Sequence, residues 1–310
     1  MAHSFRILAM PDLFLDHFVL AGDADVFVRT LKNTISRGTR MKSQQKIGLG
    51  GNAYNFAAGI ASLGCQVTFF TRTSSQLLEM LKQETKGLGI STRYVQTGCE
   101  PSLTVALEFS GRTGSGSVNI NHPGSLQCIG REDVPPGLLS KRFDMISVFN
   151  FSNNRRGPEL ARHVFSSMKG IKLMDLPDPS SDFDDADSLK DAIELSDVVS
   201  CSAAEAVHAS SLLGLNSGKG VMASASALSK LGPVVGVHSE TLCIQASSGR
   251  CTSLKIRPVK LRSTTGAGDI WTAAYAYSIL RSYSAHDRLS FASRHATAVL
   301  KKRNDEWPGG

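Results

Sequence analysis

Short apolar runs alternate with segments of helical periodicity along most of this chain, and this alternation restricts the possible fold more than any other feature. Runs such as 6–10, 67–70 and 145–148 are too short for helices and are typical of buried strands. Strands separated by helices form a mostly parallel sheet with helices on both faces, and ligands bind beyond the carboxyl ends of such strands. The other expected strands are 171–174, 198–200 and 234–237, and the expected helices are 74–88, 157–168, 186–196 and 203–213.

Two stretches, 17–47 and 91–125, depart from this alternation. They are more polar and richer in β-type alternation, and their helical signal is confined to 25–35. Within the second stretch, 103–122 reads as a β-hairpin in which alternating apolar residues lead into a long Gly/Ser turn at 111–116. We therefore expect β structure here rather than a continuation of the strand–helix pattern.

Composition argues against several classes of function. Lys and Arg (34) outnumber Asp and Glu (27), and the formal charge of +7 suits an anionic substrate such as a nucleotide. The longest basic run is 301–303 and no aromatic–basic alternation occurs, so we expect no nucleic-acid partner. No apolar run is long enough to span a bilayer, so we expect a cytoplasmic protein without a membrane partner. The six cysteines form no C-x-x-C pair and the histidines show no zinc-ligand spacing, which predicts reduced thiols and no zinc site.

The segment 263–269, Ser-Thr-Thr-Gly-Ala-Gly-Asp, has the composition of an anion-binding loop. Gly266, Ala267 and Gly268 carry no large side chain, so their backbone N–H groups are open to an anion. The apolar residues that follow recur at helical spacing, and a helix N-terminus adds partial positive charge to the loop. Asp269 stands at the mouth of this loop, where it suits the role of general base for an attacking hydroxyl. The alternative is an ordinary helix start with an acid in its first turn.

A second glycine-rich segment, Gly50-Gly51-Asn52-Ala53-Tyr54-Asn55, leads into a helical pattern that ends at Gly64. Together with Thr265-Gly266-Ala267-Gly268-Asp269 it resembles the ribokinase (PfkB) family of carbohydrate and nucleoside kinases. That family carries Gly-Gly-x-x-x-Asn near its N-terminus and Thr-Gly-Ala-Gly-Asp near its C-terminus. The order of the two motifs, their separation and the chain length all fit, so the resemblance covers essentially the whole chain.

The resemblance implies a single ribokinase-like α/β domain over residues 1–310, with a mostly parallel central sheet, helices on both faces and a small β-sheet lid. The lid would be formed by the insertions at about 17–47 and 91–125. The resemblance also implies a phosphotransferase that uses ATP and Mg²⁺ to phosphorylate a hydroxymethyl group of a sugar or nucleoside. A lid suits this reaction, because a kinase must keep water away from the phosphoryl group. A requirement for a monovalent cation and a homodimer through the lid stay open.

The family pattern also implies roles for particular residues around the acceptor. Asp269 would be the base, and Gly266, Ala267 and Gly268 would form the anion hole for the γ-phosphate. Asp16 matches the acid that binds substrate hydroxyls, because a carboxylate can accept from two vicinal hydroxyls at once. The expected substrate-binding residues are Asp12, Asp16, Gly50, Gly51 and Asn55. For Asp12 a simple turn role remains the alternative, and Asn52 is expected to cap the helix.

On the nucleotide side this sequence departs from the family pattern. The family's Asn-x-x-Glu reads Ser202-Ala203-Ala204-Glu205, so Glu205 is retained to orient Mg²⁺ through water while a serine replaces the amide. The family's Thr-x-Gly-x-x-Gly aligns with 236–241, and His238 there is either a cation near ATP or a histidine at a strand end. Ser263 stands at the position where the family usually has an Asp at the start of the anion-hole motif. The expected nucleotide-side residues are Ser202, Glu205, Gly236, His238 and Thr265.

Three functional hypotheses follow. The favoured one is a Mg-ATP-dependent sugar or nucleoside kinase, supported by the intact Gly-Ala-Gly-Asp segment at 266–269. The altered nucleotide-side motifs support an alternative, a catalytically weak or inactive member of the family that binds a sugar or nucleotide as a regulator. The third is an α/β binding protein that is not a kinase, supported by the generic strand–helix pattern alone. Ribose, a hexose, a keto-deoxy acid and a nucleoside all remain open as acceptors.

Overall fold

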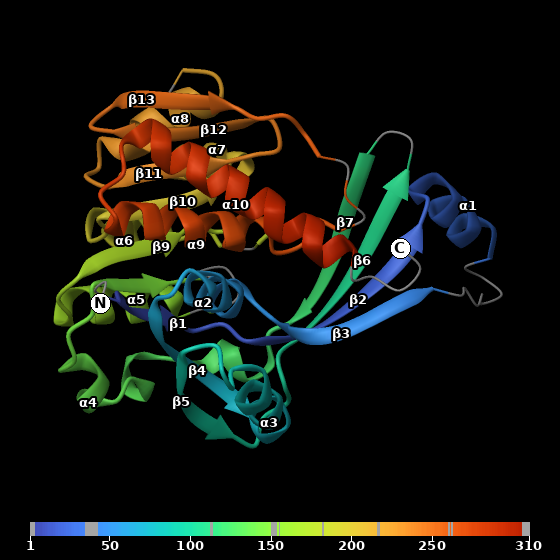
Figure 1. Ribbon diagram of the computed structural model, residues 1–310, viewed down its shortest axis with the longest axis horizontal. Coiled ribbons are helices and arrows are strands. Elements are labelled where there is room, and N and C mark those ends of the chain that lie inside the picture. Colours follow the sequence, from blue (N-terminus) through green and yellow to red (C-terminus); the bar gives the residue numbers. More distant parts are fainter. Residues whose placement is uncertain are drawn as a thin grey trace.

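The computed structural model describes residues 4–34, 43–111, 114–149, 154, 156–181, 183–215, 218–259, 261 and 263–305. Nine of the described strands are β1 (Arg6–Met10), β4 (Gln66–Ser74), β5 (Ile90–Thr97), β8 (Met145–Val148), β9 (Ile171–Asp175), β10 (Val198–Ser202), β11 (Val234–His238), β12 (Leu242–Ser247) and β13 (Arg250–Lys255). They form one sheet with the order β13-β12-β11-β10-β9-β8-β1-β4-β5 (Figure 1). From β5 to β11 neighbouring strands are parallel, which confirms the expected α/β fold.

One edge of this sheet is an antiparallel hairpin, which the sequence analysis did not predict. β12 pairs antiparallel with both β11 and β13, and Ser247 lies opposite Arg250. The two-residue turn between them has positive φ at both positions, 46° at Ser248 and 80° at Gly249. Turns of this kind match the twist of two adjacent antiparallel strands, so the Ser-Gly pair was the available signal.

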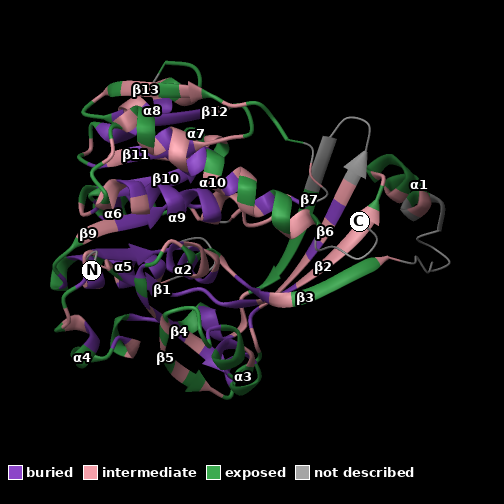
Figure 2. Cartoon of the chain, in the orientation of Figure 1, coloured by how far each residue is buried: buried purple, intermediate pink, exposed green. Residues whose placement is uncertain are grey.

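Helices cover both faces of the sheet and enclose two separate cores (Figures 1 and 2). One core includes residues of α2 (Asn52–Ser62), α3 (Ser75–Glu84), α9 (Ala267–Leu280) and α10 (Ala285–Asp305), and the other those of α5 (Gly157–Ser167), α6 (Ala186–Glu194), α7 (Ala203–Leu212) and α8 (Val221–Ser229). The interior strand β1 contributes to both, because Ile7 and Ala9 face the first core and Leu8 and Met10 face the second. In the segment that precedes β8 lie the short helices η1 (Gly124–Cys128), η2 (Arg131–Asp133) and α4 (Pro136–Leu139).

A second, smaller sheet projects from the side of the large one (Figure 1). Its strands, in the order β3-β2-β6-β7, are β2 (Phe14–Gly22), β3 (Gln44–Gly50), β6 (Leu103–Gly111) and β7 (Gly114–His122), and α1 (Ala24–Thr34) packs beside β2 and β6. The hairpin expected at 103–122 is confirmed. Its pairing continues to Gly111 opposite Gly114, so the long turn expected at 111–116 is shorter than predicted, and residues 112–113 lie outside the described part. β5, within the stretch 91–125, pairs with β4 in the large sheet instead.

The small sheet is polar on one face and apolar on the other. Asp16 lies opposite Thr104, and Thr104 lies opposite Asn121, so these polar residues share one face across three strands. On the other face Val118 and Ile120 are more than half exposed. Among the described helices none is both long and apolar enough to cross a membrane.

Candidate active site

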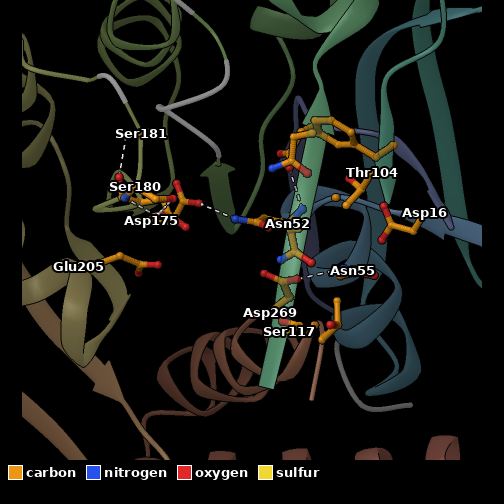
Figure 3. A pocket seen from close by; sticks show the side chains of 18 of the residues that line it. Asp16, Asn52, Asn55, Thr104, Ser117, Asp175, Ser180, Ser181, Glu205 and Asp269 are labelled. Carbon is orange, nitrogen blue, oxygen red and sulfur yellow. Dashed lines mark hydrogen bonds between the residues drawn. The ribbon is translucent and has the colours of Figure 1, made fainter. Parts of the chain in front are cut away.

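A cleft of about 430 Å³ opens where the large sheet meets the polar face of the small sheet. Asp175 ends β9, and Glu205 lies in the first turn of the helix that follows β10, so both reach the cleft from the carboxyl ends of strands. Figure 3 shows Asp175 and Glu205 on one side of the cleft, Asp16 and Thr104 on the other, and Asp269 between them. The cleft therefore occupies the position at which parallel sheets bind their ligands.

The two glycine-rich motifs of the sequence meet at the floor of this cleft. Asn55 in α2 donates a hydrogen bond from Nδ2 to Oδ2 of Asp269 in α9, at 3.0 Å. Burial raises the pKa of Asp269 well above its ordinary value, the Asn55 bond opposes that rise, and the nearby Asp12, Glu205 and Asp16 carboxylates add to it. A carboxyl group in such surroundings holds a proton more readily than an exposed one, as a general base must.

The loop before Asp269 turns sharply into α9. Gly266 adopts a left-handed conformation with φ of 77° and is the N-cap of the helix, a backbone state that glycine tolerates best. Ala267 and Gly268 are the first two helical residues, so their N–H groups lie at a helix N-terminus as expected. The N–H of Ala267 already donates to the carbonyl of Thr264 at 3.0 Å, however, so an anion there has to compete with that turn.

Asp16 points into the cleft from β2, and its carboxylate is largely shielded from water. The residue is 5% exposed, Thr104 hydrogen-bonds to its carboxylate, and Oδ1 is buried without a hydrogen-bond partner among the described residues. Burial raises the pKa of Asp16 to about 7. Gly50 makes room for this carboxylate, because a Cβ at Gly50 would lie 1.7 Å from Oδ2 of Asp16.

Asp12 and the start of α2 form a second polar group along the cleft. The Asp12 carboxylate accepts from the N–H groups of Asn52 (2.7 Å) and Ala53 (3.2 Å), which holds the N-terminus of α2. Gly51, with φ of 95°, is the N-cap, so the expectation that Asn52 caps the helix is wrong. Asn52 instead donates from Nδ2 to Oδ2 of Asp175 at 3.1 Å, across the cleft.

Asp175 was missed by the sequence reasoning. The strand expected at 171–174 stops one residue short of it, although an acid at the carboxyl end of a parallel strand was an available signal. Glu205 was expected, and it forms a reciprocal capping box with Ser202: its carboxylate accepts from the Ser202 N–H at 2.7 Å and the Ser202 hydroxyl accepts from the Glu205 N–H at 3.2 Å. Burial raises the pKa of Glu205 to about 7. In the part of the chain described, no three His, Cys, Asp or Glu side chains converge as a metal cage.

A second cavity, of about 420 Å³, lies on the other side of the anion-binding loop. It is mainly apolar: Ile256, Val259 and Leu261 line it together with Trp271. His238 also lines it, with its ring centroid 5.3 Å from that of Trp271, and burial lowers the pKa of His238 to about 4. His238 is therefore a neutral ring at pH 7, and the hypothesis of a cation near ATP is not supported.

Gly236, expected on the nucleotide side, lies inside the sheet. It pairs with Ser200 and with Gln245, and a Cβ there would lie 2.5 Å from the ring of Tyr275. The absence of a side chain at Gly236 leaves room for that ring, and Gly236 lines neither the polar cleft nor the apolar cavity, so its position is structural. Thr264 and Thr265 both border the polar cleft, and Thr264 also borders the apolar cavity.

Comparison with known proteins agrees with the fold described above. The model of the pfkB family of carbohydrate kinases matches residues 22–307. Among solved structures, the adenosine kinase from Sinorhizobium meliloti superposes with a TM-score of 0.76 at 16% identity, over 96% of this chain and 94% of that one. The ribokinase from Thermotoga maritima superposes with a TM-score of 0.72 at 17% identity, over 96% and 92%.

The adenosine kinase from Schistosoma mansoni, solved with adenosine and AMP, has a TM-score of 0.72 at 14% identity, over 96% of this chain and 95% of that one. At such identities the likeness shows a shared fold, which confirms the ribokinase-like architecture. No curated protein matches the sequence.

Proposed function

Because the chain belongs to the pfkB family of carbohydrate kinases, we propose that it transfers the γ-phosphoryl group of ATP to a hydroxymethyl group of a sugar. The observation that carries the proposal is the position of the loop 264–269 between two cavities. Gly266 and Asp269 line the polar cleft, whereas Ala267 and Gly268 line the apolar cavity. A loop that borders both cavities suits transfer of a group from a molecule in one to a molecule in the other.

Asp269 is assigned as the general base. It takes the proton of the acceptor hydroxyl as that oxygen attacks the γ-phosphorus, and the bond from phosphorus to the bridging oxygen breaks to release ADP. The raised pKa of Asp269 supports this role, because a base works best when its pKa approaches the working pH. Asn55 orients the carboxylate through its 3.0 Å hydrogen bond, and the N-terminus of α9 attracts the negative charge of the transferred group.

The apolar cavity suits the purine ring of ATP. An aromatic ring, Trp271, and the aliphatic side chains of Ile256, Val259 and Leu261 offer a surface on which a flat base can pack. The neutral His238 adds a second ring beside Trp271. The helix start at Ala267 and Gly268 then lies next to this cavity, where the phosphates of a bound nucleotide require N–H donors.

Asp175 and Glu205 are assigned to Mg²⁺, the ion that neutralises phosphate charge in this chemistry. Mg²⁺ commonly binds one or two protein carboxylates together with waters and substrate phosphates, so a full protein cage is not needed. The pKa of Glu205, raised to about 7 by burial, supports the assignment because a nearby dication would stabilise its charged form.

The lining of the cleft favours a neutral, hydroxyl-rich acceptor. Among its described residues, Phe14 and Leu176 are the large apolar side chains, and no Lys or Arg is present. The acids around it are Asp12, Asp16, Asp175, Asp178, Glu205 and Asp269. Carboxylates and amides can accept from and donate to sugar hydroxyls, whereas a phosphorylated sugar or a sugar acid would meet like charge. The base of a nucleoside would find little apolar surface, so a neutral sugar fits better.

The small sheet, named the lid from here on, covers this cleft with its polar face. It supplies Asp16, Thr104 and Asn119 to the lining. A cover over the reacting groups reduces the chance that water, rather than the acceptor, receives the phosphoryl group.

The test is ADP release from Mg-ATP by the purified protein across neutral sugars, sugar phosphates, sugar acids and nucleosides. We expect turnover that depends on a neutral sugar and falls about a thousandfold in Asp269→Asn with ATP binding retained. Asp187→Asn, the same change in the first turn of α6, serves as the matched control and should leave turnover unchanged. Silence across the whole panel, with ATP still bound, would instead favour a ligand-sensing member of the family.

A further inference from the structure

A buried carboxylate in the lid has no part in the mechanism above. Glu108 lies on β6, opposite Leu20 of β2 and Ser117 of β7, and is 2% exposed. Burying an acid is costly unless hydrogen bonds compensate for the lost water. The position of its partners therefore indicates what the residue does.

Both described partners of Glu108 belong to the anion-binding loop, far away in the sequence. Its Oε1 accepts a hydrogen bond from the hydroxyl of Ser263 at 3.0 Å and another from the hydroxyl of Thr265. Burial raises the pKa of Glu108, and these two hydroxyl donors oppose the rise. One lid oxygen thus holds two residues of the loop at once.

Ser263 is held from the other side by the last turn of α10. Its N–H donates to Oδ1 of Asn304 at 3.1 Å, and its carbonyl accepts from Nδ2 of Asn304 at 3.0 Å. Thr265 directly precedes Gly266, whose left-handed conformation starts α9, and Asp269 follows in the first turn. The bonds of Glu108 therefore act on the segment that sets the direction of the N–H groups at the start of α9 and the position of the base.

We propose that Glu108 is a positioning residue that ties the lid to the anion-binding loop, so that Gly266, Gly268 and Asp269 are held in their reactive arrangement while β6 lies over the cleft. The proposal rests on the proposed kinase function and deepens it. It also gives a physical reason for Ser263 at a position where the family pattern has Asp: the carboxylate comes from the lid, and a serine hydroxyl donates to it.

The experiment compares two changes at Glu108 with a matched change nearby. Glu108→Leu removes the acceptor oxygens at similar size, whereas Glu108→Gln keeps a carbonyl oxygen that can accept from both hydroxyls. Glu100→Leu is the control, because Glu100 stands just before β6 and its side chain is 82% exposed. Thr265→Val, which removes one donor hydroxyl at constant shape, completes a double-mutant cycle with Glu108→Leu.

We expect Glu108→Leu to lower kcat by about 10- to 100-fold, because a small displacement of reacting groups costs that much, with the acceptor KM within about threefold of wild type. Glu108→Gln should recover most of kcat, Glu100→Leu should match wild type, and the double variant should be little worse than either single one. Hydrogen exchange supplies a readout that needs no turnover. The amides of 263–268 should exchange about tenfold faster in Glu108→Leu, whereas the exchange rates of amides in the large sheet should not change.

Two results would overturn the proposal. One is wild-type kcat in Glu108→Leu together with unchanged exchange in 263–268. The other is a uniform rise in exchange over the whole chain, with kcat and acceptor KM changing together, which would mark Glu108 as a general contributor to stability. If the wild-type protein phosphorylates no acceptor, the proposed function fails alone, because local exchange in 263–268 still decides whether Glu108 holds the loop.

Discussion

Nδ2 of Asn55 lies 3.0 Å from Oδ2 of Asp269, although the two residues are separated by 214 positions in the sequence. This hydrogen bond joins the first turn of α2 to the first turn of α9 and so brings the two glycine-rich motifs into one site. It also bears on the chemistry, since an amide donor stabilises the charged form of the carboxylate that the proposed reaction uses.

Removing this donor should shift the pH dependence of turnover. The Asn55 amide lowers the pKa of Asp269, so Asn55→Leu should raise that pKa. The part of the pH profile in which kcat rises with pH should then move to higher pH. The measurement is kcat from pH 5.5 to 9 at saturating Mg-ATP and sugar. An unshifted limb with reduced kcat would mean that Asn55 only positions the base.

The two neighbouring glycines of β3 should respond very differently to a methyl group. A Cβ at Gly50 would lie 1.7 Å from Oδ2 of Asp16, whereas nothing lies within 4 Å of a Cβ at Gly48. Gly50→Ala should therefore displace Asp16 and raise the acceptor KM by roughly tenfold or more, the loss expected when one charge-assisted hydrogen bond is broken. Gly48→Ala, the matched control, should leave KM unchanged, and equal KM values for the two variants would contradict this role of Gly50.

Asp16 should make folding stability depend on pH. Its pKa is about 7 in the folded protein, whereas an unperturbed aspartate has a pKa of 3.8, so the folded state holds the proton more tightly. The contribution of Asp16 to folding stability is then fully present below pH 3.8. It is lost as the pH rises through 7, because the carboxylate must ionise in a buried site. Asp16→Asn removes this cost, so its free energy of unfolding relative to wild type should improve by about 2.5 kcal/mol at most between pH 5 and pH 8.

Urea unfolding of Asp16→Asn and wild type at the two pH values is the measurement, without ligand. The affinity of the wild-type protein for the acceptor should rise from pH 5 to pH 8 while its stability falls, since the ionised carboxylate is the better acceptor of sugar hydroxyls. A difference in stability that is the same at pH 5 and pH 8 would argue against a raised pKa at Asp16.

Gly268 should tolerate no side chain while His238 is present. A Cβ there would lie 2.8 Å from Cε1 and 3.0 Å from Nε2 of His238. Gly268→Val should abolish ATP binding measured by calorimetry, and Gly268→Ala should weaken it about tenfold or more by shifting the ring or the helix start. Gly268→Ala combined with His238→Ala should recover part of the affinity. Gly137→Ala, where nothing lies within 4 Å of the new methyl, is the control.

The parallel body of the fold could be predicted because its signals are local. Strands such as β1 and β8 are short apolar runs buried on both faces, and α5 and α6, which follow β8 and β9, show clear helical periodicity. Helix α8 was missed, since its run of Ala and Ser carries little amphipathic contrast. The hairpin of β12 and β13 was missed as well, because a two-residue Ser-Gly turn is a weaker signal than the Asn-Gly pair.

In the candidate site, too, some residues could be predicted from the sequence and others could not. Asp269, Asp16 and Asn55 could be named from motifs, because their chemistry depends on residue type and spacing along the chain. The roles of Gly50 and Glu108 could not, since each depends on an atom from another segment: the Asp16 carboxylate in one case and the hydroxyls of Ser263 and Thr265 in the other. Contacts over such separations follow from the packed fold and leave no periodic trace in the sequence.

The two cavities draw mostly on different parts of the chain. They meet at the loop 264–269 and at the start of α7, where Glu205 lines the polar cleft and Ser202 lines the apolar cavity. The polar cleft takes Asp16, Thr104 and Asn119 from the lid strands, whereas much of the lining of the apolar cavity comes from residues 256–259, from Leu261 and from α9 and α10. Under the proposed function, choice of acceptor and choice of donor are therefore separable properties of this molecule. Under the proposed function, exchange of lid strands should redirect the choice of acceptor and leave donor binding unchanged, provided that each new lid keeps a carboxylate at position 108.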